Sequence, residues 1–203
     1  MKNKYLQSTL TGILLLILSL FLTSLVQLYS NQVTSNYLSD IILDNVPAFP
    51  WPSILVNLLI WGSLGVSASI LIIVLFHPGY APFALKSVAL LYFIRAIFIS
   101  LTHLKVHPGK IPVEYGELGR LLYGSNDLFF SGHTALPLMA ALIFWDIKLV
   151  RYCLICVSVI FGGSTLLAKS HYSIDVLAVP FMVYGIFVLA TKLFKKDLSF
   201  ENS

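Results

Sequence analysis

The sequence predicts an all-α membrane protein: a single six-helix transmembrane domain over residues 1–203, with both termini in the cytoplasm. Of its 203 residues, 58% are hydrophobic and only 11% are charged, whereas a soluble domain carries about 25% charged residues. Runs of about 20 residues with one charged residue or none, the length of helix that a bilayer requires, occur six times. This composition excludes a soluble globular enzyme and a disordered chain, and no nucleic-acid partner is expected.

The six expected spans follow one another along the whole chain. They are residues 10–28, 54–76, 87–104, 128–145, 152–168 and 172–191. The first run follows two lysines, as a secretory signal would. However, its 19 uncharged residues exceed the apolar part of a signal, about 7–15 residues, and no small-residue cleavage site follows. We therefore expect a retained membrane helix. Short connections predict that the last three spans are antiparallel neighbours.

The distribution of Lys and Arg between the loops predicts the orientation. Cytoplasmic loops of membrane proteins carry an excess of these residues. Counted from a cytoplasmic N-terminus, that side receives Lys2, Lys4, Lys86, Lys148, Arg151, Lys192, Lys195 and Lys196. The opposite side receives only Lys105, Lys110, Arg120 and Lys169. The loops 29–52, 105–127 and 169–171 are therefore expected together on the extracytoplasmic face.

Polar residues at the ends of two spans are the candidates for chemistry, because ionisable groups in membrane segments are costly and mark functional sites. His171 and Asp175 lie four residues apart at the start of the last span, so on a helix they share one face. A carboxylate there fixes the tautomer of the imidazole and leaves its other nitrogen free for nucleophilic attack. The open alternative is a buried pair that only stabilises the helix start.

The segment Ser131-Gly132-His133-Thr134 opens the fourth span on the same outer side. Glycine allows a ligand to approach the backbone, and the N–H groups of a helix start favour an anion such as phosphate. Asp127 precedes this segment, and Pro137 follows it. A second histidine at the same membrane depth as His171 predicts a common site.

Two stretches of the sequence resemble the motifs of a known family. The stretch Asp127-Leu-Phe-Phe-Ser131-Gly132-His133-Thr134 and the stretch His171-Tyr172-Ser173-Ile174-Asp175-Val176 look like the two catalytic motifs of the sphingomyelin synthases. These enzymes are a branch of the type 2 phosphatidic acid phosphatase superfamily, also called lipid phosphate phosphatases. Arg95, with Thr102 and Leu104, is similar to a third stretch of that branch. The resemblance covers residues 86–192, the expected catalytic core, and implies six membrane helices and a metal-free His/His/Asp centre without cofactor.

The resemblance also implies roles for the catalytic residues. His171 attacks the phosphorus of a lipid headgroup and becomes a phosphohistidine, while Asp175 orients it. His133 protonates the departing lipid oxygen and then acts as base on the incoming hydroxyl. The partners are a phospholipid donor and a lipid hydroxyl acceptor in the membrane. The residues expected to bind substrate are Asp127, Ser131, Gly132, Arg95, Lys105 and Tyr123.

Two departures from the phosphatase branch favour headgroup transfer over hydrolysis of a phosphomonoester. That branch has an Arg-Pro pair, which this sequence lacks, and an arginine where Thr165 stands between Ser164 and His171. A phosphodiester carries one charge fewer than a phosphomonoester and needs fewer cations. Cations of the outer loops are able to replace the missing ones, so a lipid phosphate phosphatase stays the first alternative. A non-catalytic lipid-binding protein is the second.

Four further features have competing interpretations. The buried guanidinium of Arg95 either pairs with a carbonyl or ion, or contacts phosphate. The residues Glu114, Tyr115, Glu117 and Tyr123 form either a box for an ammonium headgroup or, as we favour, an ordinary interfacial loop. Cys153 and Cys156 are expected to pack in the core. A metal held by His133, His171 and Asp175 is a minor alternative, and the roles of His103 and His107 are open.

Overall fold

The computed structural model describes residues 2–33, 36–112 and 128–200, and every element in these ranges is helical. The elements are α1 (Lys2–Gln32), α2 (Ile41–Asn45), α3 (Pro52–Phe76), η1 (Pro78–Tyr80), α4 (Ala81–Leu101), α6 (Gly132–Ile143), α7 (Lys148–Leu167), α8 (Ser173–Leu177), α9 (Val179–Leu193) and η2 (Asp197–Phe200). The all-α prediction is confirmed for these residues.

Five of the described helices are long and apolar enough to cross a membrane. They are Asn3–Gln32, Pro52–Phe76, Pro78–Leu101, Lys148–Leu167 and Ser173–Leu193. The predicted fourth span, 128–145, contains only the 12-residue helix α6. That helix is about 18 Å long, so six full spans are not confirmed. It starts late because the segment before Gly132 is not helical and includes Phe129 with φ 66°.

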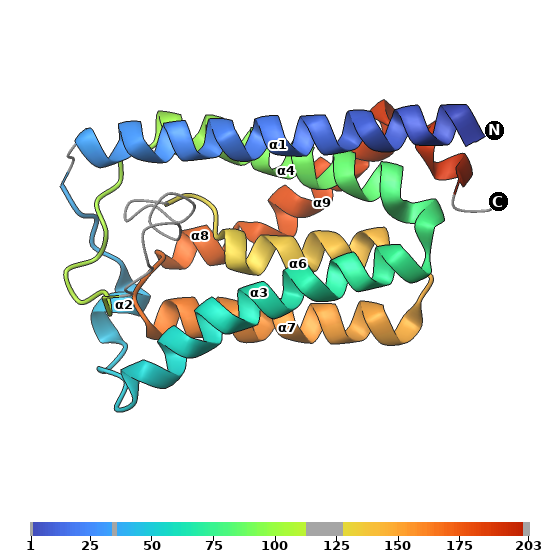
Figure 1. Ribbon diagram of the computed structural model, residues 1–203. Coiled ribbons are helices and arrows are strands. Elements are labelled where there is room, and N and C mark those ends of the chain that lie inside the picture. The colour runs from blue at the N-terminus through green and yellow to red at the C-terminus, as the bar shows by residue number, and fades with distance from the viewer. Residues whose placement is uncertain (1, 34–35, 113–127, 201–203) are drawn as a thin grey trace.

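The helices run side by side, with both termini at one end and α2 and the start of α8 at the other (Figure 1). α1 packs along α4. The two helices approach closely at Gly12, where a Cβ would lie 2.8 Å from the Cβ of Leu85. α6 contacts α3, α4, α7 and α9. Its fully buried alanines, Ala135, Ala140 and Ala141, allow these helices to approach.

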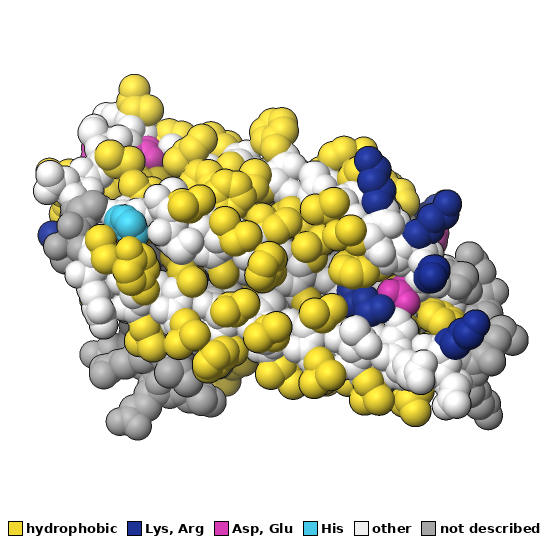
Figure 2. Space-filling model, turned by 90° about the horizontal axis from the view of Figure 1, so that it is seen from above, with side chains coloured by type: hydrophobic (Ala, Val, Ile, Leu, Met, Phe, Trp, Pro, Cys, Tyr) yellow, Lys and Arg dark blue, Asp and Glu magenta, His cyan; other side chains and the backbone are white. Residues whose placement is uncertain are grey.

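The surface has the pattern of a protein that crosses a lipid bilayer. Hydrophobic side chains cover the middle of the face seen in Figure 2, whereas Lys and Arg gather at the end that holds the termini. At this end the Lys86 ammonium lies 2.7 Å from a carboxylate oxygen of Asp197 and also donates to Ser8. This pair fixes the C-terminal η2 against α1 and α4. The side of the membrane that this end faces stays a prediction.

Two details of the sequence-based expectations need correction. The third span begins at Pro78 and ends at Leu101, instead of covering 87–104. Cys153 and Cys156 are exposed on α7 and are not packed in the core. The buried side of α7 is formed by other residues, including Leu154, Ser158 and Phe161. The two cysteines lie on the other side of this helix and point away from the bundle.

Candidate active site

The pair His171 and Asp175 lies where the chain enters α8, and both side chains are buried. The Nδ1 atom of His171 is 3.3 Å from Oδ2 of Asp175, the contact expected from their four-residue spacing. The same oxygen accepts the backbone N–H of Tyr172 at 3.1 Å. The aspartate therefore holds both the ring and the start of the helix, and it leaves Nε2 as the ring nitrogen with which an electrophile can react.

His133 lies in the first turn of α6, next to His171. The two ring centroids are 6.4 Å apart, with the ring planes inclined by 66°. A backbone contact ties the two segments together, because the N–H of Ser131 donates to the carbonyl of Asp175 at 3.2 Å. The imidazole of α6 and that of the segment just before α8 thus lie close together at the end of the bundle opposite the termini.

The turns that lead to both histidines are conformationally strained. Phe129, four residues before His133, has φ 66°, and Lys169, two residues before His171, has φ 51°. Left-handed backbone at a residue other than glycine costs about 1–3 kcal/mol and persists where the surrounding structure enforces it. The packing of the bundle therefore sets the approach of both segments.

Arg95 of α4 reaches the same segment from the side. Its side chain is 2% exposed, and Nε donates to the carbonyl of Phe130 at 2.9 Å. Its guanidinium also lies against Gly132, where a Cβ would come within 3.3 Å of Nε and Cζ. The carbonyl contact expected for this buried arginine is therefore present. A side chain at Gly132 would therefore require the guanidinium to move by a few tenths of an ångström.

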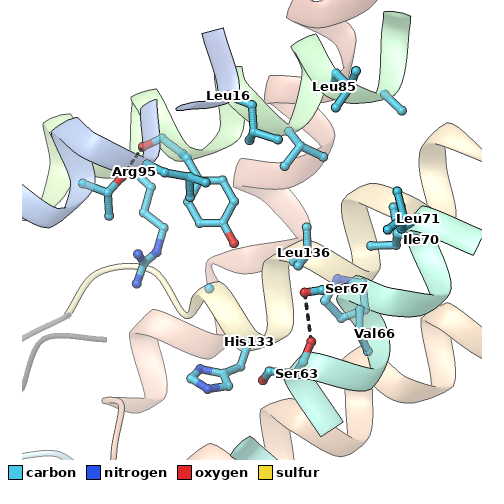
Figure 3. A pocket seen from close by; sticks show the side chains of 18 of the residues that line it. Leu16, Ser63, Val66, Ser67, Ile70, Leu71, Leu85, Arg95, His133 and Leu136 are labelled. Carbon is cyan, nitrogen blue, oxygen red and sulfur yellow. Dashed lines mark hydrogen bonds between the residues drawn. The ribbon is translucent and has the colours of Figure 1, made fainter. Parts of the chain in front are cut away.

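A cavity of about 420 Å³ extends from His133 and Arg95 into the bundle (Figure 3). Its walls come from α1, α3, α4 and α6, together with Phe161 of α7. Arg95 and His133 lie at one end, and apolar side chains such as Leu71 and Leu85 lie at the other. The volume is within the range of about 300–1,000 Å³ for small-molecule sites. The cavity thus joins an ionisable end to an apolar interior, which suits a lipid.

The loop between α1 and α3 also contributes to the site, a role that the sequence analysis did not foresee. One carboxylate oxygen of Asp40 accepts the N–H groups of Ile42 and Leu43 and so caps α2. The other accepts the N–H of Ser173, the first residue of α8, at 2.7 Å. Burial acts to raise the pKa of Asp40, but the donors on Ser173, Leu43 and Ile42 outweigh it and lower the pKa below its ordinary value. The signal was Asp40 before the apolar run 41–43, a typical helix cap.

The remaining predicted substrate-binding residues differ in how far they are buried, and two of them lie outside the described residues. Ser131 is buried, and its hydroxyl accepts from that of Thr134 at 3.2 Å. Lys105 is exposed and contributes its backbone carbonyl, which accepts the Tyr172 hydroxyl at 2.7 Å. Asp127 and Tyr123 lie outside the described residues, as do Glu114, Tyr115, Glu117 and Arg120.

Two further positions, Thr165 and Lys169, concern the cations that could reach the site. Thr165, which stands where the phosphatase branch has arginine, is fully buried and donates to the carbonyl of Gly162. Lys169 packs towards the loop at Gly109, where a Cβ would lie 3.1 Å from its Cδ. Within the part of the chain that the structure describes, no three His, Cys, Asp or Glu residues are grouped so as to hold a metal ion.

Two adjacent glycines of α7, Gly162 and Gly163, differ in the space around them near Asp175. A Cβ at Gly162 would lie 3.0 Å from Cγ1 of Val176, whereas one at Gly163 meets nothing within 4 Å. We expect Gly162→Val to cost about 1–3 kcal/mol by overpacking and to lower activity, because it pushes α8 away. Gly163→Ala is the matched control and should be neutral or stabilising. Thermal unfolding in detergent checks this, and equal effects of the two substitutions would contradict the packing.

Comparison with known proteins supports the resemblance at the level of the superfamily. Residues 124–192 match the family model described as PAP2 superfamily C-terminal, which supports the type 2 phosphatidic acid phosphatase superfamily. Its members are phosphatases and phosphotransferases, and the match does not distinguish between the two reactions. No curated protein and no solved structure gave a match to the chain. The match and the long apolar helices fit an integral membrane protein.

Proposed function

We propose that this protein is a membrane enzyme that transfers a phospho-headgroup from a phospholipid to the hydroxyl of a second lipid. One observation carries the proposal: the ring of His133, on α6, and the ring of His171, in the segment before α8, lie 6.4 Å apart, while Asp175 contacts Nδ1 of His171. A nucleophile held by a carboxylate, with a second imidazole close by, is the arrangement that acid–base-assisted covalent transfer requires.

The first half of the reaction forms a phosphohistidine on His171. Its Nε2 attacks the phosphorus, and the bond between phosphorus and the lipid oxygen breaks. His133, as the imidazolium, gives its proton to the departing oxygen, so that a neutral lipid alcohol leaves. Asp175 orients the attacking ring and stabilises the positive charge that develops on it.

The second half reverses the roles. The acceptor hydroxyl gives its proton to His133, its oxygen attacks the phosphorus, and the bond to His171 breaks. Arg95 and the N-terminal end of α6 at Ser131 and Gly132 lie beside His133 and are suited to the phosphate charge, and Lys105 adds a cation at the same end. The apolar cavity beside His133 and Arg95 is suited to a lipid chain. No metal or cofactor takes part, and the reaction occurs on the extracytoplasmic face.

Transfer is favoured over phosphomonoester hydrolysis by the charge of the site. Thr165 replaces the arginine of the phosphatase branch and is fully buried, so no cation enters from that position. A phosphodiester presents one negative charge fewer and is the better match. The alternative is a lipid phosphate phosphatase, in which water replaces the acceptor hydroxyl. A protein that only binds lipid is the second alternative.

An acceptor-dependence assay separates the three functions. The purified protein in detergent is incubated with headgroup-labelled phospholipid, with and without ceramide or diacylglycerol, and in parallel with labelled phosphatidic acid. We expect labelled product lipid that depends on the acceptor. Free phosphate from phosphatidic acid, without lipid product, would assign the phosphatase. Turnover of neither substrate would assign the binding protein and contradict the proposal.

A further inference from the structure

The loop before α3 is tied to the residues that follow the candidate nucleophile. Asp40 is 8% exposed, and its Oδ2 accepts the N–H of Ser173 at 2.7 Å, while Oδ1 accepts those of Ile42 and Leu43 at 3.0 and 3.1 Å. One carboxylate thus caps α2 and the first residue of α8 together. Hydrogen bonds to an ionised acceptor are short and about twice as strong as neutral ones.

A second tie fixes the neighbouring residue. The hydroxyl of Tyr172 donates to the carbonyl of Lys105 at 2.7 Å and accepts the N–H of Leu38 at 3.1 Å. Tyr172 is 2% exposed and packs with Leu43 and Leu128. The two residues after His171 are therefore held by contacts from two other loops at the same end of the bundle, and the loop of Asp40 contributes to both.

We infer that Asp40 is a positioning residue for the proposed reaction: it holds the backbone at Ser173, and through it His171, in the place where attack on phosphorus occurs. This rests on the proposed function. Asp175 orients the ring of His171 only if the start of α8 stays in place, because both residues belong to that start. A displacement of about 1 Å at a reacting group lowers the rate by about 10²-fold. The hydrogen bond from Ser173 to Asp40 is therefore expected to affect the rate of the reaction.

Asp40→Asn tests the role with little change of shape. The amide keeps one oxygen to cap α2 but loses the second acceptor, which faces Ser173. Asp44→Asn is the matched control, because Asp44 belongs to the same helix and its carboxylate contacts Ser39, His107 and the N–H of Asp40. We expect Asp40→Asn to lower kcat by about 10–100-fold with little change in KM, and Asp44→Asn to leave both within about twofold.

Ser173→Pro removes the same bond from the other side. Proline suits the first residue of a helix, and the backbone of Tyr172, with φ −69° and ψ 157°, is compatible with a following proline. Because both substitutions act on the contact between Asp40 and Ser173, we expect the double variant to be no slower than the slower single variant. Additive losses of kcat would show two separate effects and overturn the inference.

Hydrogen exchange distinguishes a failure of this inference from a failure of the proposed function. In detergent, amide exchange of the peptide covering 171–177 should accelerate in Asp40→Asn and not in Asp44→Asn, while the melting temperatures stay close. Unchanged exchange or unchanged kcat in Asp40→Asn would overturn the inference. If the wild type turns over no substrate, the proposed function fails, and the exchange comparison still decides whether Asp40 holds this segment.

Discussion

His171→Gln is expected to lower headgroup transfer by at least about 10⁴-fold, because the substitution removes the atom that bonds to phosphorus in the proposed reaction. Glutamine retains a polar side chain of similar length, so the loss is not attributable to an empty site. The structure gives His171 little freedom, since its ring is 5% exposed and contacts Asp175. Initial rates with labelled phospholipid and a saturating acceptor measure the effect.

Trapping the phosphohistidine during turnover tests whether His171 is the residue that becomes labelled. Wild-type protein quenched with denaturant during turnover should carry acid-labile label from the headgroup phosphate, and His171→Gln should carry none. Asp175→Asn keeps the nucleophile but loses the carboxylate that orients it, so we expect a loss of about 10²–10⁴-fold and not complete inactivity. His77→Gln, at an exposed histidine near the opposite end of the bundle, controls for the loss of an imidazole. Label retained in His171→Gln would assign the nucleophile elsewhere.

The pairing of His171 with Asp175 was predicted from their four-residue spacing, but the reason differs in part. His171 precedes α8, and Asp175 reaches it by folding back over the start of that helix, where the same oxygen accepts the N–H of Tyr172. The convergence of His133 on His171 was predictable for a different reason. Short connections make the last helices antiparallel neighbours, and the orientation puts both segments at one end. The resemblance rests on the same two motifs, and residues 124–192 match the family model described as PAP2 superfamily C-terminal.

The contacts of the loops were not predictable in the same way. Asp40 and Ser173 are 133 residues apart, and a cap on α2 is visible in the sequence whereas its second bond to α8 is not. The short α6 and the outward-facing Cys153 and Cys156 were also missed. The length of α6 depends on the non-helical turn at Phe129, which an apolar run does not reveal. The direction of the cysteines depends on which side of α7 faces its neighbours, and an apolar sequence in a membrane gives little information about this, because lipid-facing and core-facing residues are equally hydrophobic.

The cavity explains why His133, and not His171, is the better candidate for the acid. His133 lines the cavity together with Arg95 and Gly132, and His171 is not among its lining residues. A lipid chain in this cavity would bring the oxygen of its alcohol to His133, while the phosphorus lies between the two rings. The leaving alcohol and the acceptor hydroxyl would therefore reach the same imidazole in turn.

His133→Gln is accordingly expected to lower transfer from a natural phospholipid by about 10²–10⁴-fold, the usual contribution of a general acid or base. The loss should depend on the leaving group. A lipid alkoxide is strongly basic and needs a proton, whereas nitrophenolate leaves without one. With a nitrophenyl ester of the headgroup phosphate as donor, the first half of the reaction should proceed in the variant at a rate close to that of the wild type.

The second half of the reaction should then fail, because the acceptor hydroxyl still lacks its base. We expect a burst of about one nitrophenolate per active site, followed by slow turnover, and accumulation of acid-labile label on His171. The double variant His133→Gln with His171→Gln should give no burst. Equal losses with the lipid and the nitrophenyl donor would show that His133 does not protonate the leaving oxygen, and a normal rate after the burst would show that it does not activate the acceptor.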